Sequence, residues 1–242
     1  DTTRYGEDLY GRLALPELLE KLCRLDGVRW VRMLYCYPDR ITDRLLDVMA
    51  REEKIVKYMD IPIQHVNGRI LSLMNRRGDA GSLTALMEKI RARVPGVVLR
   101  TTLITGFPTE TQGEFEELCE FVQRVRFERL GCFAYSAEED TPAALMDGQL
   151  DEEEKRRRAQ IIMEQQYGVM EGFNRSQIGR RLTVAVEGRE GRLWYGRSYM
   201  DAPDIDSRVY FSGHGPYSPG DYIEVEIDGV EGYDLKGKAL NK

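Results

Sequence analysis

The stretch LRTTLITGFPTET, Leu99 to Thr111, predicts a buried strand that ends abruptly in a Gly-Phe-Pro turn. Its branched and apolar residues favour a strand, which stops because Gly106 frees φ and Pro108 fixes it. Apolar residues at helical spacing predict that a helix follows over 114–125, capped by Thr111 or Thr109. This order of strand, turn and helix N-terminus is where α/β proteins place ligands, because free backbone N–H groups there point at the ligand.

Around this stretch the chain alternates between helix and strand patterns. Helices are expected over 13–25, 41–51 and 82–94, the last capped by Ser82, with a short helix around Leu71 and Met74; strands are expected over 28–37, 55–65 and 129–135. Alternation of this kind predicts right-handed β/α units and a parallel sheet. Four strands are too few for an eightfold barrel, so residues 1–150 are predicted to form an α/β domain, a partial TIM-like (β/α) barrel.

After residue 150 the pattern changes twice. Residues 151–176 predict a connector helix, because Glu152, Glu153 and Glu154 stand four residues before three arginines, a spacing typical of exposed helical ion pairs. Residues 177–242 predict a small five-stranded OB-like barrel, since short strand patterns alternate with Gly and Pro turns. Its expected strands are Leu182–Glu187, Leu193–Arg197, Val209–Ser212, Tyr222–Ile227 and Asp234–Ala239.

The composition argues against several classes of protein. Charged residues make up 31% of the 242 residues and the net charge is −6, which indicates an ordinary globular protein without a DNA-binding surface. We expect a cytoplasmic location, because the sequence shows neither a membrane-spanning run nor a signal h-region. The four cysteines stand singly, with no CxxC or CxxxCxxC, so we expect buried apolar thiols and no metal site.

Polar residues on the predicted strands are the candidates for a binding site. Alternation puts Arg100 and Ile104 on one strand face, and a buried arginine needs an anion. Its partner is open between a ligand carboxylate or phosphate and Asp60 across the barrel. Gln64 shares a face with Asp60 and lies at the carboxyl end of its strand, where barrel enzymes build their sites. His65 has no second His or Cys nearby in the sequence, so we interpret it as structural.

Five motifs, in order, resemble those of the radical S-adenosylmethionine (SAM) methylthiotransferases. They are YMDIPIQH at 58–65, MNRRG at 74–78, RTTLITGFPTET at 100–111, FAYSAEEDTPA at 133–143 and GRSYMDAPDID at 196–206. The combination of DIPIQH with DAPDID is similar to the type that modifies a conserved aspartate of a small-subunit ribosomal protein. This resemblance covers nearly the whole chain and implies a partial radical-SAM barrel followed by a small β-barrel called TRAM.

The same resemblance implies the cofactors. The full-length family has SAM and two [4Fe-4S] clusters. Reductive cleavage of SAM there yields a 5′-deoxyadenosyl radical, which takes a hydrogen from the target β-carbon before a methylthio group is inserted. The cofactor-binding positions carried over to this chain are Gln64, Arg100, Ile104, Gly106, Phe107 and Pro108. Thr109 stands where the family motif GFPGET has glycine. The family's CxxxCxxC is absent from these residues, so we expect a C-terminal fragment that is inactive alone and holds no catalytic residue or metal ligand.

Charge in the predicted barrel suggests a partner. Nine acids and one base lie between Asp201 and Asp234, a local charge of −8. An acidic face suits a basic ribosomal protein, with Asp201, Asp204 and Asp206 as candidate contacts, although a merely solvated face remains the alternative. Contact with nearby ribosomal RNA is a further open alternative, because arginines lie at 180, 181, 189, 192 and 197. The alternative to an enzyme is a non-catalytic ribosome- or tRNA-binding module made of an empty barrel plus TRAM.

Overall fold

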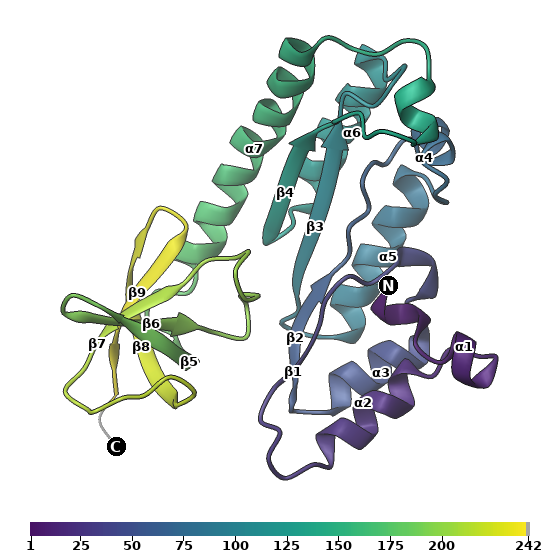
Figure 1. The fold of residues 1–242 in the computed structure, drawn as a ribbon. Helices are drawn as coiled ribbons and strands as arrows, with labels where there is room; N and C mark the ends of the chain where they lie inside the picture. The colour runs from purple at the N-terminus through teal and green to yellow at the C-terminus, as the bar shows by residue number, and fades with distance from the viewer. Residues whose placement is uncertain (241–242) are drawn as a thin grey trace. The chain divides into compact units, whose positions relative to one another are not determined.

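The computed structural model describes residues 1–240 and divides into two compact units, residues 1–167 and residues 168–242 (Figure 1). The boundary falls inside helix α7, Glu152–Arg175. The bounds expected from the sequence, 1–150, 151–176 and 177–242, therefore stay a prediction. Within residues 1–240, no helix is both long enough and apolar enough to cross a membrane.

The first unit is built on a four-stranded parallel sheet in the order β1-β2-β3-β4. The strands are β1 Val31–Met33, β2 Ile55–Asp60, β3 Val98–Thr105 and β4 Arg129–Ala134. Sequential parallel neighbours are what consecutive β/α units produce, so the predicted fold class is confirmed. The strand expected over 28–37 shrinks to three residues, because Tyr35 adopts a left-handed φ of 59° and turns the chain.

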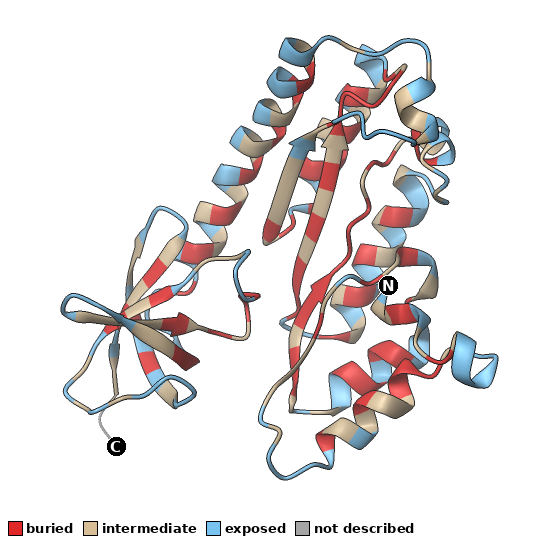
Figure 2. Cartoon of the chain, in the orientation of Figure 1, coloured by how far each residue is buried: buried red, intermediate tan, exposed pale blue. Residues whose placement is uncertain are grey.

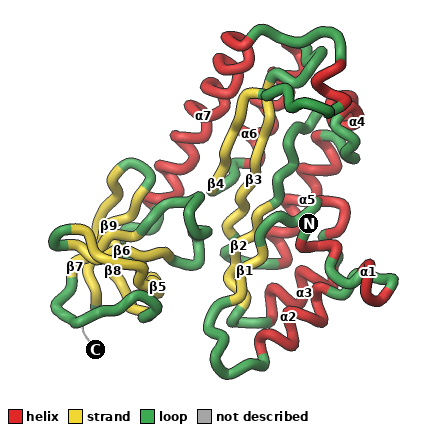
Figure 3. The backbone as a smooth tube through the Cα atoms, viewed as in Figure 1, coloured by secondary structure: helices red, strands yellow, loops and turns green. Residues whose placement is uncertain are grey.

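The helices α2 Leu15–Cys23, α3 Asp43–Arg51, α5 Ala80–Arg93 and α6 Gln112–Val125 pack along one face of this sheet (Figures 1 and 3). Two short helices, α1 Glu7–Tyr10 and α4 Gly68–Leu73, lie outside this layer, and 3-10 turns occur at Thr2–Arg4, Pro38–Arg40 and Pro142–Leu145. Thr111 caps α6, one of the two caps expected. The cap expected for α5 is wrong: Asp79 is the N-cap, and Ser82 completes a capping box from the third helical position.

The two faces of β3 have different surroundings. Thr101, Leu103 and Thr105 are buried on the face that the helices cover, whereas Arg100 and Ile104 are only partly buried on the opposite face. Figure 2 shows this alternation along β3. The helix-covered face carries the main hydrophobic core, which includes Leu46, Met49, Met59, Leu103 and Phe121. The opposite face, which we call the open face, is therefore left for polar side chains.

Helix α7 carries the acid and base pattern that predicted it. Glu154 pairs with Arg158 four residues later at 2.7 Å, and with Arg157 three residues later at 2.6 Å. Arg158 is nevertheless buried rather than exposed, so the expectation of solvent-exposed pairing is wrong for this residue. The helix also packs into the first unit, because Ile162 belongs to its hydrophobic core.

The second unit is a closed five-stranded barrel, as predicted, and its strand order is β5-β6-β7-β9-β8. Its strands are β5 Arg181–Glu190, β6 Leu193–Arg197, β7 Val209–Ser212, β8 Tyr222–Glu231 and β9 Asp234–Ala239. The neighbours pair antiparallel except β7 and β9, which are parallel. Glycine is required at Gly196, where a Cβ would lie 2.1 Å from the carbonyl oxygen of Ala185, so the barrel closes only without a side chain there.

Candidate functional site

The strands β2, β3 and β4 end at one edge of the sheet, which we call the carboxyl edge. Beyond β2 the chain pairs once more with β3: Gln64 donates its N–H to the Thr102 carbonyl at 2.9 Å and accepts from the Ile104 N–H at 2.8 Å. Gln64 has a left-handed φ of 68°, which is uncommon for a residue with a side chain. Two backbone hydrogen bonds therefore hold an unusual conformation at a residue that the sequence singled out.

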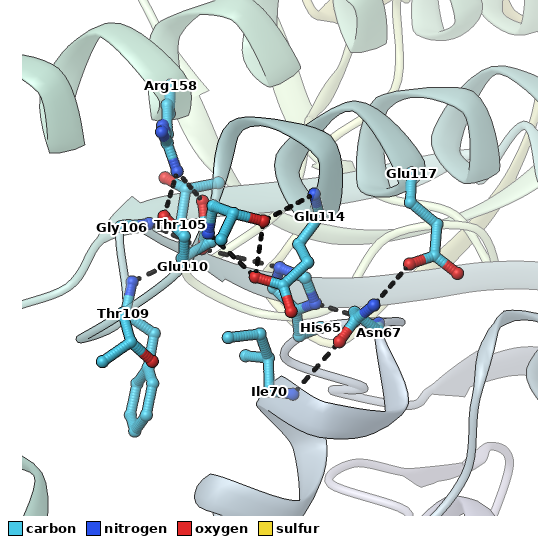
Figure 4. A network of polar contacts seen from close by, with 12 residues as sticks. His65, Asn67, Ile70, Thr105, Gly106, Thr109, Glu110, Glu114, Glu117 and Arg158 are labelled. Carbon is cyan, nitrogen blue, oxygen red and sulfur yellow. Dashed lines mark hydrogen bonds and ion pairs between the residues drawn. The ribbon is translucent and has the colours of Figure 1, made fainter.

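The N–H groups of the Gly-Phe-Pro turn and of Thr109 are already hydrogen-bonded to other groups of the protein (Figure 4). The Gly106 and Phe107 N–H groups donate to the Glu110 carboxylate at 2.9 and 3.4 Å, and the Thr109 N–H donates to the Gly148 carbonyl at 2.8 Å. Pro108 has no N–H to offer. The expectation that free N–H groups of this turn face a ligand is therefore wrong, because a buried glutamate four residues after Gly106 takes them.

The turn instead contributes apolar surface at the carboxyl edge. The rings of Phe107 and Tyr135 meet edge to face with centroids 5.2 Å apart, and both are buried. Ile70 joins them in one cluster, against which Ile104, Met74 and Met146 pack as partly buried residues. Ile104 and Phe107, two of the predicted cofactor positions, thus lie in the same apolar wall.

Three buried polar atoms at this edge lack hydrogen-bond partners among the described residues. They are the side-chain oxygen Oε1 of Gln64 and the ring nitrogen Nε2 of His65, both after β2, and the hydroxyl of Tyr135, directly after β4. A buried polar group left unpaired costs about 1–3 kcal/mol, so native structures rarely keep one without a reason. A polar ligand that reached this edge would pair with Gln64 Oε1 and the Tyr135 hydroxyl, and SAM binding here stays a prediction.

Arg100 on the open face has a protein partner. Its Nη1 donates to Asp60 Oδ1 at 2.9 Å and to Thr102 Oγ1 at 3.2 Å, while Asp60 Oδ2 accepts from the Tyr35 N–H at 3.0 Å. The sequence left two candidate partners for Arg100, a ligand anion and Asp60. In the structure Arg100 pairs with Asp60. The pair fixes the guanidinium on the open face, and a cofactor-binding role for Arg100 stays a prediction.

An iron–sulfur cluster does not fit the residues present. Among residues 1–240, no three Cys, His, Asp or Glu side chains converge in a way that could hold a metal. Burial raises the pKa of the Cys36 thiol to about 12, and burial does the same for Cys132. Both thiols stay protonated at neutral pH, whereas iron is ligated by thiolates.

The candidate partner residues of the barrel differ in exposure. Asp201 is only 1% exposed and its Oδ2 accepts from the Ser198 hydroxyl at 2.8 Å, so its prediction as a surface contact is corrected: this carboxylate builds the loop. Asp206 accepts from the Ala202 N–H at 2.8 Å and is half-buried. Asp204 is exposed. Further exposed acids, missed as individual contacts, alternate along the outer face of β8: Glu224, Glu226 and Asp228.

Comparison with known proteins follows the same two units. Residues 5–122 match the Radical SAM superfamily and residues 178–240 match the TRAM domain, which spans all five barrel strands. Proteins named ribosomal protein uS12 methylthiotransferase RimO are similar over almost the whole chain. The one from Lachnoclostridium phytofermentans is 47% identical over 99% of this chain, and the one from Desulforudis audaxviator is 44% identical over 100%. Over almost its whole length the chain is therefore similar to RimO proteins, with a Radical SAM match followed by a TRAM match.

The chain spans about half the length of these RimO relatives, 55% and 54% respectively. Among solved structures, the radical SAM enzyme HemN of Escherichia coli is similar with a TM-score of 0.46 and 20% identity, over 59% of this chain and 32% of that chain. The alignment with the RimO relatives extends across both units, the parallel sheet and the barrel.

Three residues of the carboxyl edge were missed from the sequence. Glu110 and Tyr135 lie inside two of the five motifs, RTTLITGFPTET and FAYSAEEDTPA. These motifs therefore pointed to the right segments but not to these two side chains. Arg158, which donates to Glu110, lies 48 residues away from it. Its charge pattern predicted an exposed helix face, and no local signal could have identified its buried partner.

Proposed function

We propose that this chain is the C-terminal part of a radical SAM methylthiotransferase that places a methylthio group on the β-carbon of an aspartate in ribosomal protein uS12. The observation that carries this proposal is the 42–47% identity to relatives of that name over nearly all of the chain. The unpaired Gln64 Oε1 and Tyr135 hydroxyl at the carboxyl edge support it, because they favour a polar ligand where barrel enzymes bind theirs.

SAM, when bound, supplies the adenosyl group from which the radical of this chemistry derives. Ile104 and Phe107 provide an apolar wall for its adenine, and Gly106 and Pro108 shape the turn that carries this wall. Gln64 Oε1 accepts a hydrogen bond from the ligand. The guanidinium of Arg100, oriented by Asp60, offers positive charge to a ligand carboxylate.

The ligands of both iron–sulfur clusters lie outside these residues in this proposal, so the 242 residues are inactive by themselves. The test is to extend the open reading frame upstream, reconstitute the longer protein with iron and sulfide, and analyse uS12 by mass spectrometry. We expect an upstream CxxxCxxC, SAM cleavage, and a mass gain of one methylthio group replacing one hydrogen. An upstream sequence without that motif would overturn the enzyme proposal in favour of a ribosome- or tRNA-binding module.

We also propose that the acidic side of the TRAM barrel meets the basic uS12 protein in the cytoplasm. Asp204, Glu224 and Glu226 are exposed acids, which favours encounter with a basic partner, whereas Asp228 pairs with Lys238 at 3.1 Å. Asp206 borders the same loop, although its carboxylate also holds the loop backbone. The arginines at the start of the barrel, Arg180 and Arg181, would contact ribosomal RNA that surrounds this partner.

A further inference from the structure

A buried carboxylate connects the Gly-Phe-Pro turn to helix α7. The side chain of Glu110 is fully buried, and its Oε2 accepts from the Gly106 and Phe107 N–H groups. Its other oxygen, Oε1, accepts from Arg158 Nη1 at 2.7 Å. One carboxylate therefore joins the backbone of the turn to a cation on a helix that begins 46 residues after the turn starts.

Arg158 is fixed on several sides. The same Nη1 donates to the Glu110 carbonyl at 3.1 Å, Nε donates to Glu154 Oε1 at 2.7 Å, and the guanidinium lies 5.2 Å from the centre of the Phe115 ring. Its side chain is 6% exposed. Because removal of one partner from a buried pair leaves an uncompensated charge, loss of Arg158 would disturb Glu110 strongly.

A second residue of α7 contacts the same turn. Gly106 has a left-handed φ of 72°, and a Cβ there would lie 2.5 Å from Lys155 Cγ, so the helix packs directly on the glycine. Lys155 and Arg158 are three residues apart and thus share one helix face. The turn is therefore held from this side by packing as well as by charge.

His65, after the end of β2, lies beside this network without a hydrogen bond from its Nε2 (Figure 4). It is fully buried, and its Nδ1 accepts from the Asn67 N–H at 3.0 Å. An accepting Nδ1 carries no proton, so in the neutral ring the proton is on Nε2, which lies 3.5 Å from Glu110 Oε2. The polar hydrogen of His65 thus faces the carboxylate oxygen that holds the turn.

We propose that Arg158 is a positioning residue: through Glu110 it holds the Gly106–Phe107 backbone in its ligand-binding shape and so couples α7 to cofactor affinity. The nature of the ligand rests on the proposed function. Phe107 belongs to the apolar wall, and the two N–H bonds to Glu110 fix the backbone from which its ring projects. Without Arg158 the carboxylate would turn toward water, and the turn would lose its anchor.

The test compares Arg158→Gln with Arg157→Gln, a matched control on the same helix. Arg157 is exposed, and its ion pair is with Glu154, so it does not contact Glu110. Amide hydrogen exchange is measured by NMR at Gly106 and Phe107, and binding of S-adenosylhomocysteine by calorimetry. For Arg158→Gln we expect protection of both amides and ligand affinity to fall about tenfold or more, the loss typical of a charged hydrogen bond.

The control should leave both quantities unchanged, and Arg158→Lys should restore part of each. Amides of Leu46 and Met49 in the core of α3 report global stability. Equal loss of protection there and in the turn would contradict a positioning role, as would unchanged exchange and affinity in Arg158→Gln. Failure of the unaltered chain to bind S-adenosylhomocysteine would instead contradict the cofactor assignment, while the exchange data would still decide whether Arg158 anchors the turn.

Discussion

Thr109 holds a backbone conformation that a β-branched residue rarely adopts. Its φ is 69°, and the resembling family motif has glycine at this position. Arg69 compensates by donating to the Thr109 hydroxyl at 2.9 Å and to its carbonyl at 2.8 Å. The substitution relative to the family is therefore accommodated by one arginine of α4, at the expense of local strain.

Two replacements of Thr109 distinguish the effect of backbone strain on stability from the effect of losing the hydroxyl. Both Thr109→Gly and Thr109→Ala lose the hydrogen bond between Arg69 and the hydroxyl, but only alanine keeps a Cβ at positive φ, so we expect the glycine variant to be more stable by about 1 kcal/mol. Urea unfolding measures this difference. Thr84 in helix α5 is the control, because there alanine should be the more stable variant, as in any helix interior. The same order at both positions would contradict strain at Thr109.

The hydroxyl of Tyr135 is expected to serve binding rather than stability. Since it is buried without a partner among the described residues, Tyr135→Phe should leave the free energy of unfolding unchanged or raise it by up to about 1 kcal/mol. The affinity for S-adenosylhomocysteine should fall about tenfold, which is the loss of one ligand hydrogen bond. Tyr217→Phe removes a hydroxyl from the barrel instead and should leave affinity intact. A Tyr135 variant that loses stability but keeps affinity would argue against a ligand contact.

At the scale of single elements, the N-terminus of α6 depends on an ionised carboxylate. The Arg69 guanidinium, together with the Thr111 N–H and hydroxyl, lowers the pKa of Glu114 from 4.5 to about 2. Because the folded pKa lies below the ordinary value, ionised Glu114 stabilises the fold above pH 4.5, and this stabilisation is lost as the pH falls from 4.5 towards 2. The capping box of the helix is thus an acid-sensitive feature.

The variant Glu114→Gln tests this dependence. At neutral pH it should melt at a lower temperature than the unaltered chain, and the difference should shrink as the pH approaches the lowered pKa of about 2. Glu120→Gln removes the same charge from an exposed position further along α6 and should show no such convergence. A stability difference that stays constant with pH would contradict the role of the carboxylate.

Over the whole molecule, residues 177–242 carry only −2 of the net charge of −6, but exposed acids line β8. The double variant Asp204→Asn, Glu226→Gln should weaken binding to purified uS12 about tenfold at low salt, because electrostatic attraction between exposed charges is strongest there. Fluorescence anisotropy over a salt series measures the effect, which should diminish as salt rises.

A matched control removes two charges from the first unit. Asp26→Asn with Glu53→Gln changes exposed acids by the same amount and should leave uS12 affinity nearly unchanged. Equal weakening by both double variants would indicate a general charge effect, and unchanged affinity of the barrel variant at low salt would contradict the acidic face as the partner surface.

The sequence by itself determined the kind and order of the elements. Apolar periodicity and turn residues act locally, which is why β6, β7 and β9 have the predicted bounds and the parallel sheet and closed barrel were both expected. The five motifs likewise pointed to the family and to Gln64 and the Gly-Phe-Pro turn.

Tertiary structure alone decided how the polar groups pair. Glu110 takes the N–H groups of the turn, Arg158 reaches it from α7, and Asp201 is buried in a loop. Each of these contacts depends on burial, and burial is set by packing between segments far apart in the chain. A charge pattern within one helix carries no information about which carboxylate another segment places beside it, so the chain had to fold before Arg158 could be distinguished from its exposed neighbour Arg157.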